Sequence, residues 1–161
     1  MPSLLRLRMP VSDDLHPRSF VTKIVTYERV VDVPNSHTLL HDLLPAALVL
    51  AEHNETGVYN FTNPGAISHN EVLSIYQRLV LPGFEWKNFS LDEQAMVIKA
   101  GRSNCMLDTT KLETKLAEYG LTVPEVHEAY EQCFLRMAQE METASVQQLV
   151  LRHAQQVDVE T

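Results

Sequence analysis

Glycine is scarce in this 161-residue chain and is never clustered. A loop that cradles phosphates through its backbone amides needs several glycines within one turn, as in GxGxxG or the P-loop. The glycines here stand apart, at positions 57, 65, 83, 101 and 120. No tyrosine is followed four residues later by a lysine, so a Tyr-x-x-x-Lys proton-transfer pair is also missing. The sequence therefore lacks the parts for nicotinamide chemistry.

Cysteine and long apolar runs are also scarce. Cys105 and Cys133 fit no metal-ligand spacing, so a reduced chain is the simplest interpretation. No apolar run approaches the roughly 20 residues that span a bilayer. The opening "MPSLLRLRMP" has arginines inside its apolar stretch and no small-residue cleavage site. These absences predict a cytoplasmic protein with no membrane partner.

The charge balance is acidic, with a formal net charge of −8. Such a balance argues against nucleic acid or an anionic membrane as a partner. A few placed arginines in an acidic chain suit a small anionic ligand better. The content of 45% hydrophobic and 21% charged residues is that of an ordinary globular domain with a core.

Short β-prone segments alternate with helical patterns along the chain, which favours an α/β arrangement. We expect strands at 4–9, 29–33 and 57–61, and helices at 19–27, 38–54, 68–81, 90–101, 109–119 and from Pro124 past residue 150. These are too few strands for a complete doubly wound sheet. The prediction is a partial Rossmann-type sheet edge with a small α/β domain, ending in a long helix.

Two helix starts carry the capping-box spacing, Ser68 with Glu71 and Ser90 with Glu93. Each serine can accept a hydrogen bond from a free helix amide while the glutamate reaches back to the cap amide. Proline is unfavourable inside a helix, so Pro45 places the regular start of the 38–54 helix near Asp42.

The final helix divides into two parts. Its first part carries a one-sided apolar stripe, typical of a helix docked on a core: Val126, Tyr130, Cys133, Phe134 and Met137. The residues after it are more polar. We therefore divide the chain into a folded portion, 1–137, and a polar helical tail, 138–161, that acts as a tail or an oligomer contact.

His37 and His41 stand four residues apart, the spacing at which two helical histidines can share a zinc ion. The metalloprotease motif needs a glutamate after the first histidine, and Thr38 stands there instead. No third ligand is evident, so ordinary polar residues at a helix entry are the favoured interpretation, and no metal is predicted.

The stretch "KAGRSNCMLDTTKL", residues 99–112, has the side chains of an anion site. Arg102 follows an expected helix end, with Ser103 and Asn104 beside it. An arginine fork with amide and hydroxyl neighbours suits a pyrophosphate. The alternative, that Arg102 bonds carbonyl groups at the end of its own helix, is equally compatible with the spacing.

Several motifs together resemble one family: "LRLRMPVSDDL", "RSFVTKI", "VVDVPNS", "NFTNPGAISHNEVL" and "GRSN…LD". They resemble the C-terminal half of the nucleotide-rhamnose synthase/epimerase-reductase, an extended short-chain dehydrogenase similar to dTDP-4-dehydrorhamnose reductase. The resemblance covers residue 5 to about residue 137. It implies a 3,5-epimerase/4-reductase of UDP-rhamnose biosynthesis that acts on UDP-4-keto-6-deoxyglucose.

The resemblance also implies a role for individual residues. Met9 and Pro10 would pass near the nicotinamide of NADPH. Arg18, Arg102 and Asn104 would face the nucleotide sugar, with Asn63 as a peripheral contact. The sequence departs from the plant pattern at "GRSNC" and at His41, which leaves Arg102 in place but puts local sugar contacts in doubt.

The family's NADPH-binding loop and catalytic tyrosine and lysine have no counterpart in this sequence. The expectation is a UDP-sugar-binding half that is inactive by itself and needs no cofactor alone. A non-catalytic regulatory or interaction subunit and a fragment without an autonomous role are the alternatives. We also expect an exposed sheet edge, and hence self-association or a Rossmann-bearing partner.

Overall fold

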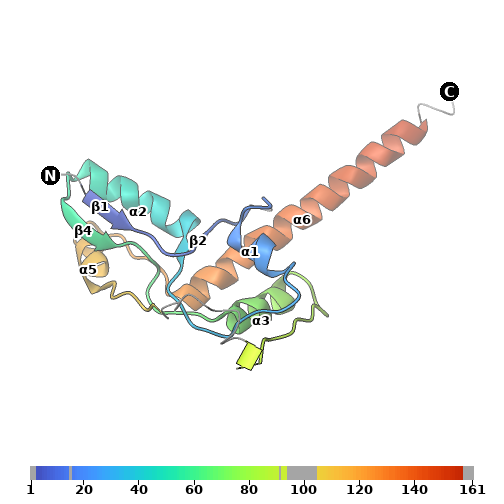
Figure 1. The fold of residues 1–161 in the computed structure, drawn as a ribbon. Helices are drawn as coiled ribbons and strands as arrows, with labels where there is room; N and C mark the ends of the chain where they lie inside the picture. The colour runs from blue at the N-terminus through green and yellow to red at the C-terminus, as the bar shows by residue number, and fades with distance from the viewer. Residues whose placement is uncertain (1–2, 15, 91, 94–104, 158–161) are drawn as a thin grey trace.

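The computed structural model describes residues 3–14, 16–90, 92–93 and 105–157. It is a mixed α/β structure with short parallel sheets, as the sequence predicts (Figure 1). In chain order the elements are β1 (Ser3–Arg6), β2 (Pro10–Val11), α1 (Phe20–Ile24), β3 (Thr38–Leu39), α2 (Leu40–Glu52), β4 (Gly57–Asn60), α3 (His69–Leu79), α5 (Thr110–Glu118) and α6 (Val126–Val157).

The first sheet pairs β1 with β4 in parallel, with Leu4 beside Val58 and Leu5 beside Tyr59. Successive side chains of a strand point to opposite faces, so Leu5 and Tyr59 share one face and Leu4 and Val58 share the other. Tyr59 and Phe61 belong to a buried cluster that residues of α2 and α5 complete: Leu43, Ala46, Leu50, Leu112 and Leu116. One face of the sheet is therefore covered by helices.

The second sheet is the parallel pair of β2 and β3, with Pro10 beside Thr38 and Val11 beside Leu39. The chain reaches it directly from β1, and the amide of Thr38 donates to the carbonyl of Arg8 at 2.8 Å. The short sheet leads into the larger hydrophobic cluster, to which Val11 and Leu39 both contribute.

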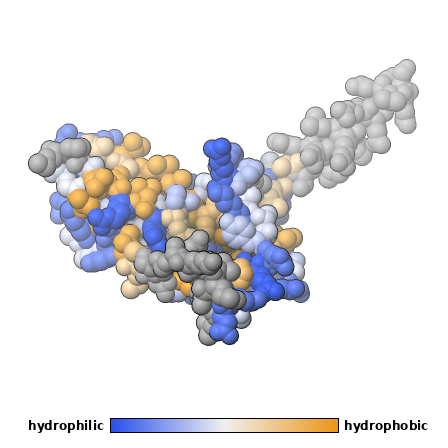
Figure 2. Space-filling model, in the orientation of Figure 1, coloured by the Kyte–Doolittle hydropathy of each residue, from blue (hydrophilic) through white to orange (hydrophobic). Residues whose placement is uncertain are grey.

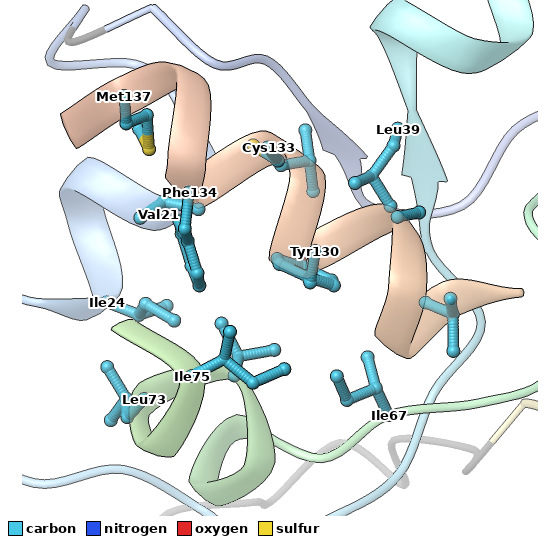
Figure 3. Packing of buried hydrophobic residues seen from close by; sticks show 14 of the residues in the cluster. Val21, Ile24, Leu39, Ile67, Leu73, Ile75, Tyr130, Cys133, Phe134 and Met137 are labelled. Atoms are coloured by element: carbon cyan, nitrogen blue, oxygen red, sulfur yellow. The ribbon is translucent and has the colours of Figure 1, made fainter. Parts of the chain in front are cut away.

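The larger cluster is built around the first four turns of α6. Figure 3 shows Tyr130, Cys133, Phe134 and Met137 of α6 facing α1 and α3. All five residues of the predicted stripe, Val126 included, are at most 2% exposed, which confirms the helix face that the sequence indicates. Beyond the core α6 continues away from the body of the molecule (Figure 1).

The two capping boxes that the sequence predicts are both present in the structure. Ser68 caps α3, where its hydroxyl accepts from the amide of Glu71 and the Glu71 carboxylate accepts from the amide of Ser68 at 2.7 Å. The same reciprocal pair joins Ser90 and Glu93, at 2.9 and 3.2 Å. The rest of the expected helix at 90–101 lies outside the described residues apart from 92–93.

Two expectations are wrong. Helix α2 begins at Leu40 rather than near Asp42 and contains Pro45 within it. Pro45 is exposed and has no amide hydrogen to donate, so the carbonyl four residues before it, that of His41, can accept a hydrogen bond from solvent instead. The expected strand at 29–33 is a single parallel bridge between Val30 and Asn88, because no longer strand lies beside it in the described part of the chain.

Among the described residues, no helix combines the length and the apolar character that crossing a bilayer requires.

Candidate functional site

The candidate site begins where β1 ends. In open parallel sheets ligands bind beyond the carboxyl ends of the strands. The chain leaves β1 through Leu7 and Arg8 and turns at Met9, whose φ of 42° is in the left-handed region that non-glycine residues rarely adopt. Strained backbone of this kind gathers at ligand sites, where surrounding contacts hold it in place. Met9 is half-buried and Pro10 is exposed.

A polar network holds the next part of the site together. Arg8 Nη2 donates to Asn35 Oδ1 at 2.8 Å, and the amide of Cys105 donates to the same oxygen at 3.3 Å. Ser36 ties the same segment, since its amide donates to the Cys105 carbonyl at 2.9 Å and its hydroxyl accepts from the amide of Leu107 at 2.9 Å. The buried Asn35–Ser36 pair therefore joins the end of β1 to Cys105.

Arg102 and Asn104, the predicted phosphate and sugar contacts, lie outside the described residues. Cys105 is the first described residue after that segment.

Asn63 is the predicted peripheral contact, and the structure buries it completely. Its Oδ1 accepts from the amide of Leu39 at 2.9 Å. Its Nδ2 donates to Asp42 Oδ2 and to the carbonyl of Pro124, both at 3.2 Å. The side chain thus joins β3, α2 and the residue before the α6 entry, and both of its amide hydrogens are used within the chain.

Arg18 lies in the exposed loop before α1. Its amide donates to His16 Nδ1 at 3.1 Å, and its guanidinium makes no ion pair or hydrogen bond with the residues that the structure describes. The described contacts bring Arg8, Asn35 and Cys105 together near Met9, but they do not join Arg18 or Asn63 to that group.

His37 and His41 do not form a metal pair. His37 precedes β3 in extended chain and is 1% exposed, whereas His41 is an exposed residue of α2. His37 Nδ1 lies 2.6 Å from the Tyr130 hydroxyl. Burial, followed by the nearby His69 and Arg8, lowers the pKa of His37 to about 3, so its ring is neutral at neutral pH. No group of three metal-ligating side chains occurs among the described residues.

NADPH does not fit the described residues by themselves. A dinucleotide pyrophosphate needs a glycine cradle open to a ligand. Gly65 has a positive φ of 90°, but the space beside it is filled by the carboxylate of Glu125. Met9 and Pro10 can supply at most one side of a nicotinamide contact.

Sequence reasoning missed Arg8 and Asn35. The signal for Arg8 was a second arginine in an otherwise apolar strand, where a charge needs a partner. Asn35 follows a proline in "VPNS", a place where an asparagine side chain commonly bonds nearby backbone. Neither pattern indicates that Arg8 and Asn35 bond to each other, because 27 positions separate the two residues.

No protein-family model matches the chain. It is similar to the bifunctional dTDP-4-dehydrorhamnose 3,5-epimerase/dTDP-4-dehydrorhamnose reductase of Arabidopsis thaliana, with 58% identity over 115 residues, covering 71% of this chain and 38% of the relative. A trifunctional UDP-glucose 4,6-dehydratase/UDP-4-keto-6-deoxy-D-glucose 3,5-epimerase/UDP-4-keto-L-rhamnose-reductase from the same plant is 52% identical over 115 residues, which cover 71% of this chain and 17% of that protein. The chain thus spans well under half of these relatives.

Solved structures agree with the sequence comparison. The UDP-rhamnose synthase of Acanthamoeba polyphaga mimivirus matches 81% of this chain and 44% of its own length, with a TM-score of 0.73 and 39% identity. The dTDP-4-dehydrorhamnose reductase of Bacillus anthracis, solved in complex with NADP, matches 83% of this chain and 48% of its own, with a TM-score of 0.61 and 17% identity, a likeness of fold alone. Over its matched residues the chain is therefore similar to part of the bifunctional and trifunctional 3,5-epimerase/reductases and of the viral UDP-rhamnose synthase.

Proposed function

We propose that this chain is the nucleotide-sugar-binding portion of a 3,5-epimerase/4-reductase of UDP-rhamnose biosynthesis. Its ligand is UDP-4-keto-6-deoxyglucose or UDP-rhamnose, bound beyond the carboxyl end of β1. Arg102 and Arg18 supply the positive charge for the diphosphate, and Asn104 contacts the sugar. The chain by itself does not carry out hydride transfer, because the sequence has neither a glycine-rich loop nor a Tyr-x-x-x-Lys pair.

The observation that supports this proposal is the Asn35–Ser36 attachment of Cys105. It joins the strained turn at Met9 to the residue that directly follows "GRSN" in the sequence. A nucleotide sugar needs a fixed arginine fork for its diphosphate and amide or hydroxyl groups for its sugar. The network offers a support for such groups, and the relatives that the chain matches are named as 3,5-epimerases and reductases of dehydrorhamnose or keto-rhamnose nucleotides.

The second candidate is a non-catalytic regulatory or interaction subunit that keeps the fold. The observation that favours it is the length of α6, which continues to Val157, whereas Met137 is its last buried residue among the side chains that the structure describes, up to Ala144. A helix that leaves the core in this way is suited to contact another protein.

Calorimetric titration of the 161-residue chain with UDP tests the first proposal. We expect saturable binding that Arg102→Ala abolishes, because the diphosphate loses its fork. Arg78→Ala is the matched control, since Arg78 pairs with Glu131 at the junction of α3 and α6, away from the network. Folded wild-type protein that does not bind UDP contradicts the proposal, and so does equal loss of binding in both variants.

A further inference from the structure

The segment between β2 and α1 is closed by a hydrogen bond at its base. The Ser19 hydroxyl donates to the carbonyl of Ser12 at 3.2 Å. Ser19 stands at the N-cap of α1, where a serine hydroxyl usually accepts from a helix amide, but it makes no such bond here. Its hydroxyl instead joins the two ends of the segment. We call residues 12–14 and 16–19 the Arg18 loop.

Hydrogen bonds inside the Arg18 loop connect Asp14 to Arg18 step by step. Asp14 Oδ1 accepts from the Ser12 hydroxyl at 2.9 Å and from the amide of His16 at 3.2 Å. His16 Nδ1 accepts from the amide of Arg18 at 3.1 Å, and the His16 carbonyl accepts from the amide of Ser19 at 2.9 Å. The backbone of Arg18 is therefore held in place relative to Asp14, although it lies at the surface.

An ion pair attaches the Arg18 loop to the long helix. Arg136 of α6 donates from Nε to Asp13 Oδ2 at 2.6 Å, and the two side chains are 28% and 27% exposed. Arg136 is followed by Met137, a buried residue of the larger cluster, so its guanidinium extends from a helix turn that the core holds. A partly buried pair is screened by salt less than an exposed one. The loop is therefore tied to a fixed part of the molecule.

The Arg18 guanidinium has no partner among the described residues, although Arg18 is exposed and its amide is bonded. The other arginines whose side chains are described each bind an acceptor through the guanidinium: Arg6, Arg8, Arg29, Arg78 and Arg136. Figure 2 shows hydrophilic surface over the segment that leads into α1. A cation with unused donors on a tied loop is suited to an anion, because the loop loses little further freedom on binding.

We propose that Arg136 is a positioning residue for the nucleotide sugar. Through Asp13 it holds the Arg18 loop in the conformation in which the Arg18 guanidinium binds the diphosphate, and it does not touch the ligand itself. This inference rests on the proposed function, in which Arg18 supplies positive charge. Without the ion pair the free loop samples more conformations, and ligand binding must then order it again.

A double-mutant cycle with UDP as the ligand tests this role by calorimetric titration of the full chain. We expect Arg136→Gln to raise the dissociation constant about three- to tenfold, the effect of losing a partly buried ion pair. Arg136→Lys keeps a charge within reach of Asp13 and should raise it less than about twofold. In the Arg18→Ala background Arg136→Gln should have no further effect, because the cation that it positions is gone.

Arg78→Gln is the matched control. It also breaks an ion pair to α6, that between Arg78 and Glu131, but this pair joins α6 to α3 and leaves the Arg18 loop untouched. The variant should bind UDP like wild type. Far-ultraviolet circular dichroism checks that each variant is folded.

Amide hydrogen exchange, measured by nuclear magnetic resonance without UDP, gives a second readout. The amides of His16, Arg18 and Ser19 donate to the bonds that hold the loop. They should exchange faster in Arg136→Gln than in wild type and at the wild-type rate in Arg78→Gln. Equal exchange in Arg136→Gln and wild type overturns the proposal.

The titrations separate this inference from the proposed function. Folded wild-type protein that does not bind UDP overturns both. Binding that Arg102→Ala abolishes but Arg136→Gln leaves unchanged overturns this inference alone. An effect of Arg136→Gln that persists in the Arg18→Ala background, or that Arg78→Gln reproduces, also overturns it, because the loss then does not act through Arg18.

Discussion

The hydroxyl of Tyr130 and Nδ1 of His37 lie 2.6 Å apart inside the larger core. Both side chains are at most 1% exposed, and they come from α6 and from the segment that enters β3. Because His37 is neutral when buried, Nδ1 can accept the hydroxyl proton. This bond holds the segment that contains Asn35, Ser36 and His37 against α6.

We expect Tyr130→Phe to lower the free energy of unfolding by about 1–3 kcal/mol, because it leaves a buried imidazole nitrogen without a partner. The ring and its packing against Phe134 stay, so the loss is that of the hydrogen bond. Urea unfolding measures it. Tyr76→Phe is the control, since the structure records no bond from the Tyr76 hydroxyl to any described residue, and a change below about 0.5 kcal/mol is expected there.

His37 should make the protein less stable in acid. Its pKa is about 6.5 in the unfolded chain and about 3 in the folded one, so below 6.5 the unfolded state binds the extra proton. The free energy of unfolding therefore falls as the pH drops below that value, by at most about 1.4 kcal/mol per pH unit from this residue.

The measurement is urea unfolding at neutral pH and near about pH 5, for wild type and for His37→Gln, which can still accept from Tyr130. Acidic groups contribute equally to both proteins, so the difference isolates the histidine. Equal pH slopes in the two proteins would contradict the expectation.

His127 should act in the opposite direction. Burial lowers the pKa of His127, but its contacts with Glu125 at 2.9 Å and Glu71 at 3.3 Å raise that pKa by more than burial lowers it. The net shift of the His127 pKa is therefore upward. The stabilisation is complete below the unfolded pKa of about 6.5 and is lost as the pH rises through the higher folded value. The side chain is 42% exposed, so we expect less than about 1 kcal/mol.

Unfolding of His127→Gln on both sides of that range measures the effect of His127. High salt should reduce the difference from wild type, because an exposed ion pair is screened. A difference that grows as the pH rises would show that the sign is wrong.

Two buried threonines should respond oppositely to the same substitution. Thr62 and Thr38 are both 0% exposed. The Thr62 hydroxyl has no hydrogen-bond partner in the described part of the chain, whereas that of Thr38 donates to the Phe61 carbonyl at 2.7 Å. Valine has nearly the same shape. Thermal unfolding should show Thr62→Val stabilised by about 1 kcal/mol and Thr38→Val destabilised by about 1–3 kcal/mol. Loss of stability in both would contradict this assignment.

Signals within one helix were readable from the sequence. The Ser68–Glu71 capping box and the α6 stripe both depend on residues three or four positions apart, and the structure contains both. The start of α2 was not readable in the same way. A proline forbids one hydrogen bond, but the sequence alone did not indicate that the lost bond faces solvent at Pro45.

The candidate site was only partly predictable for a related reason. The motifs indicate which residue types gather near a ligand, but the hydrogen-bond partners of the polar side chains are distant in sequence. Asn63 bonds to Pro124, which is 61 positions away, and Asn35 bonds to Cys105, which is 70 positions away. No local pattern shows whether an asparagine serves a ligand or its own backbone.

The two hydrophobic clusters meet across polar contacts, among them Thr38 with Phe61 and Asn63 with Leu39 and Asp42. Sliding one cluster past the other breaks these hydrogen bonds, which new polar partners can replace. Motion within either cluster would instead open a void in close-packed side chains. We therefore expect any relative motion of the two clusters to be a shear at these polar contacts, which lie beside Arg8 at the end of the chain segment that follows β1.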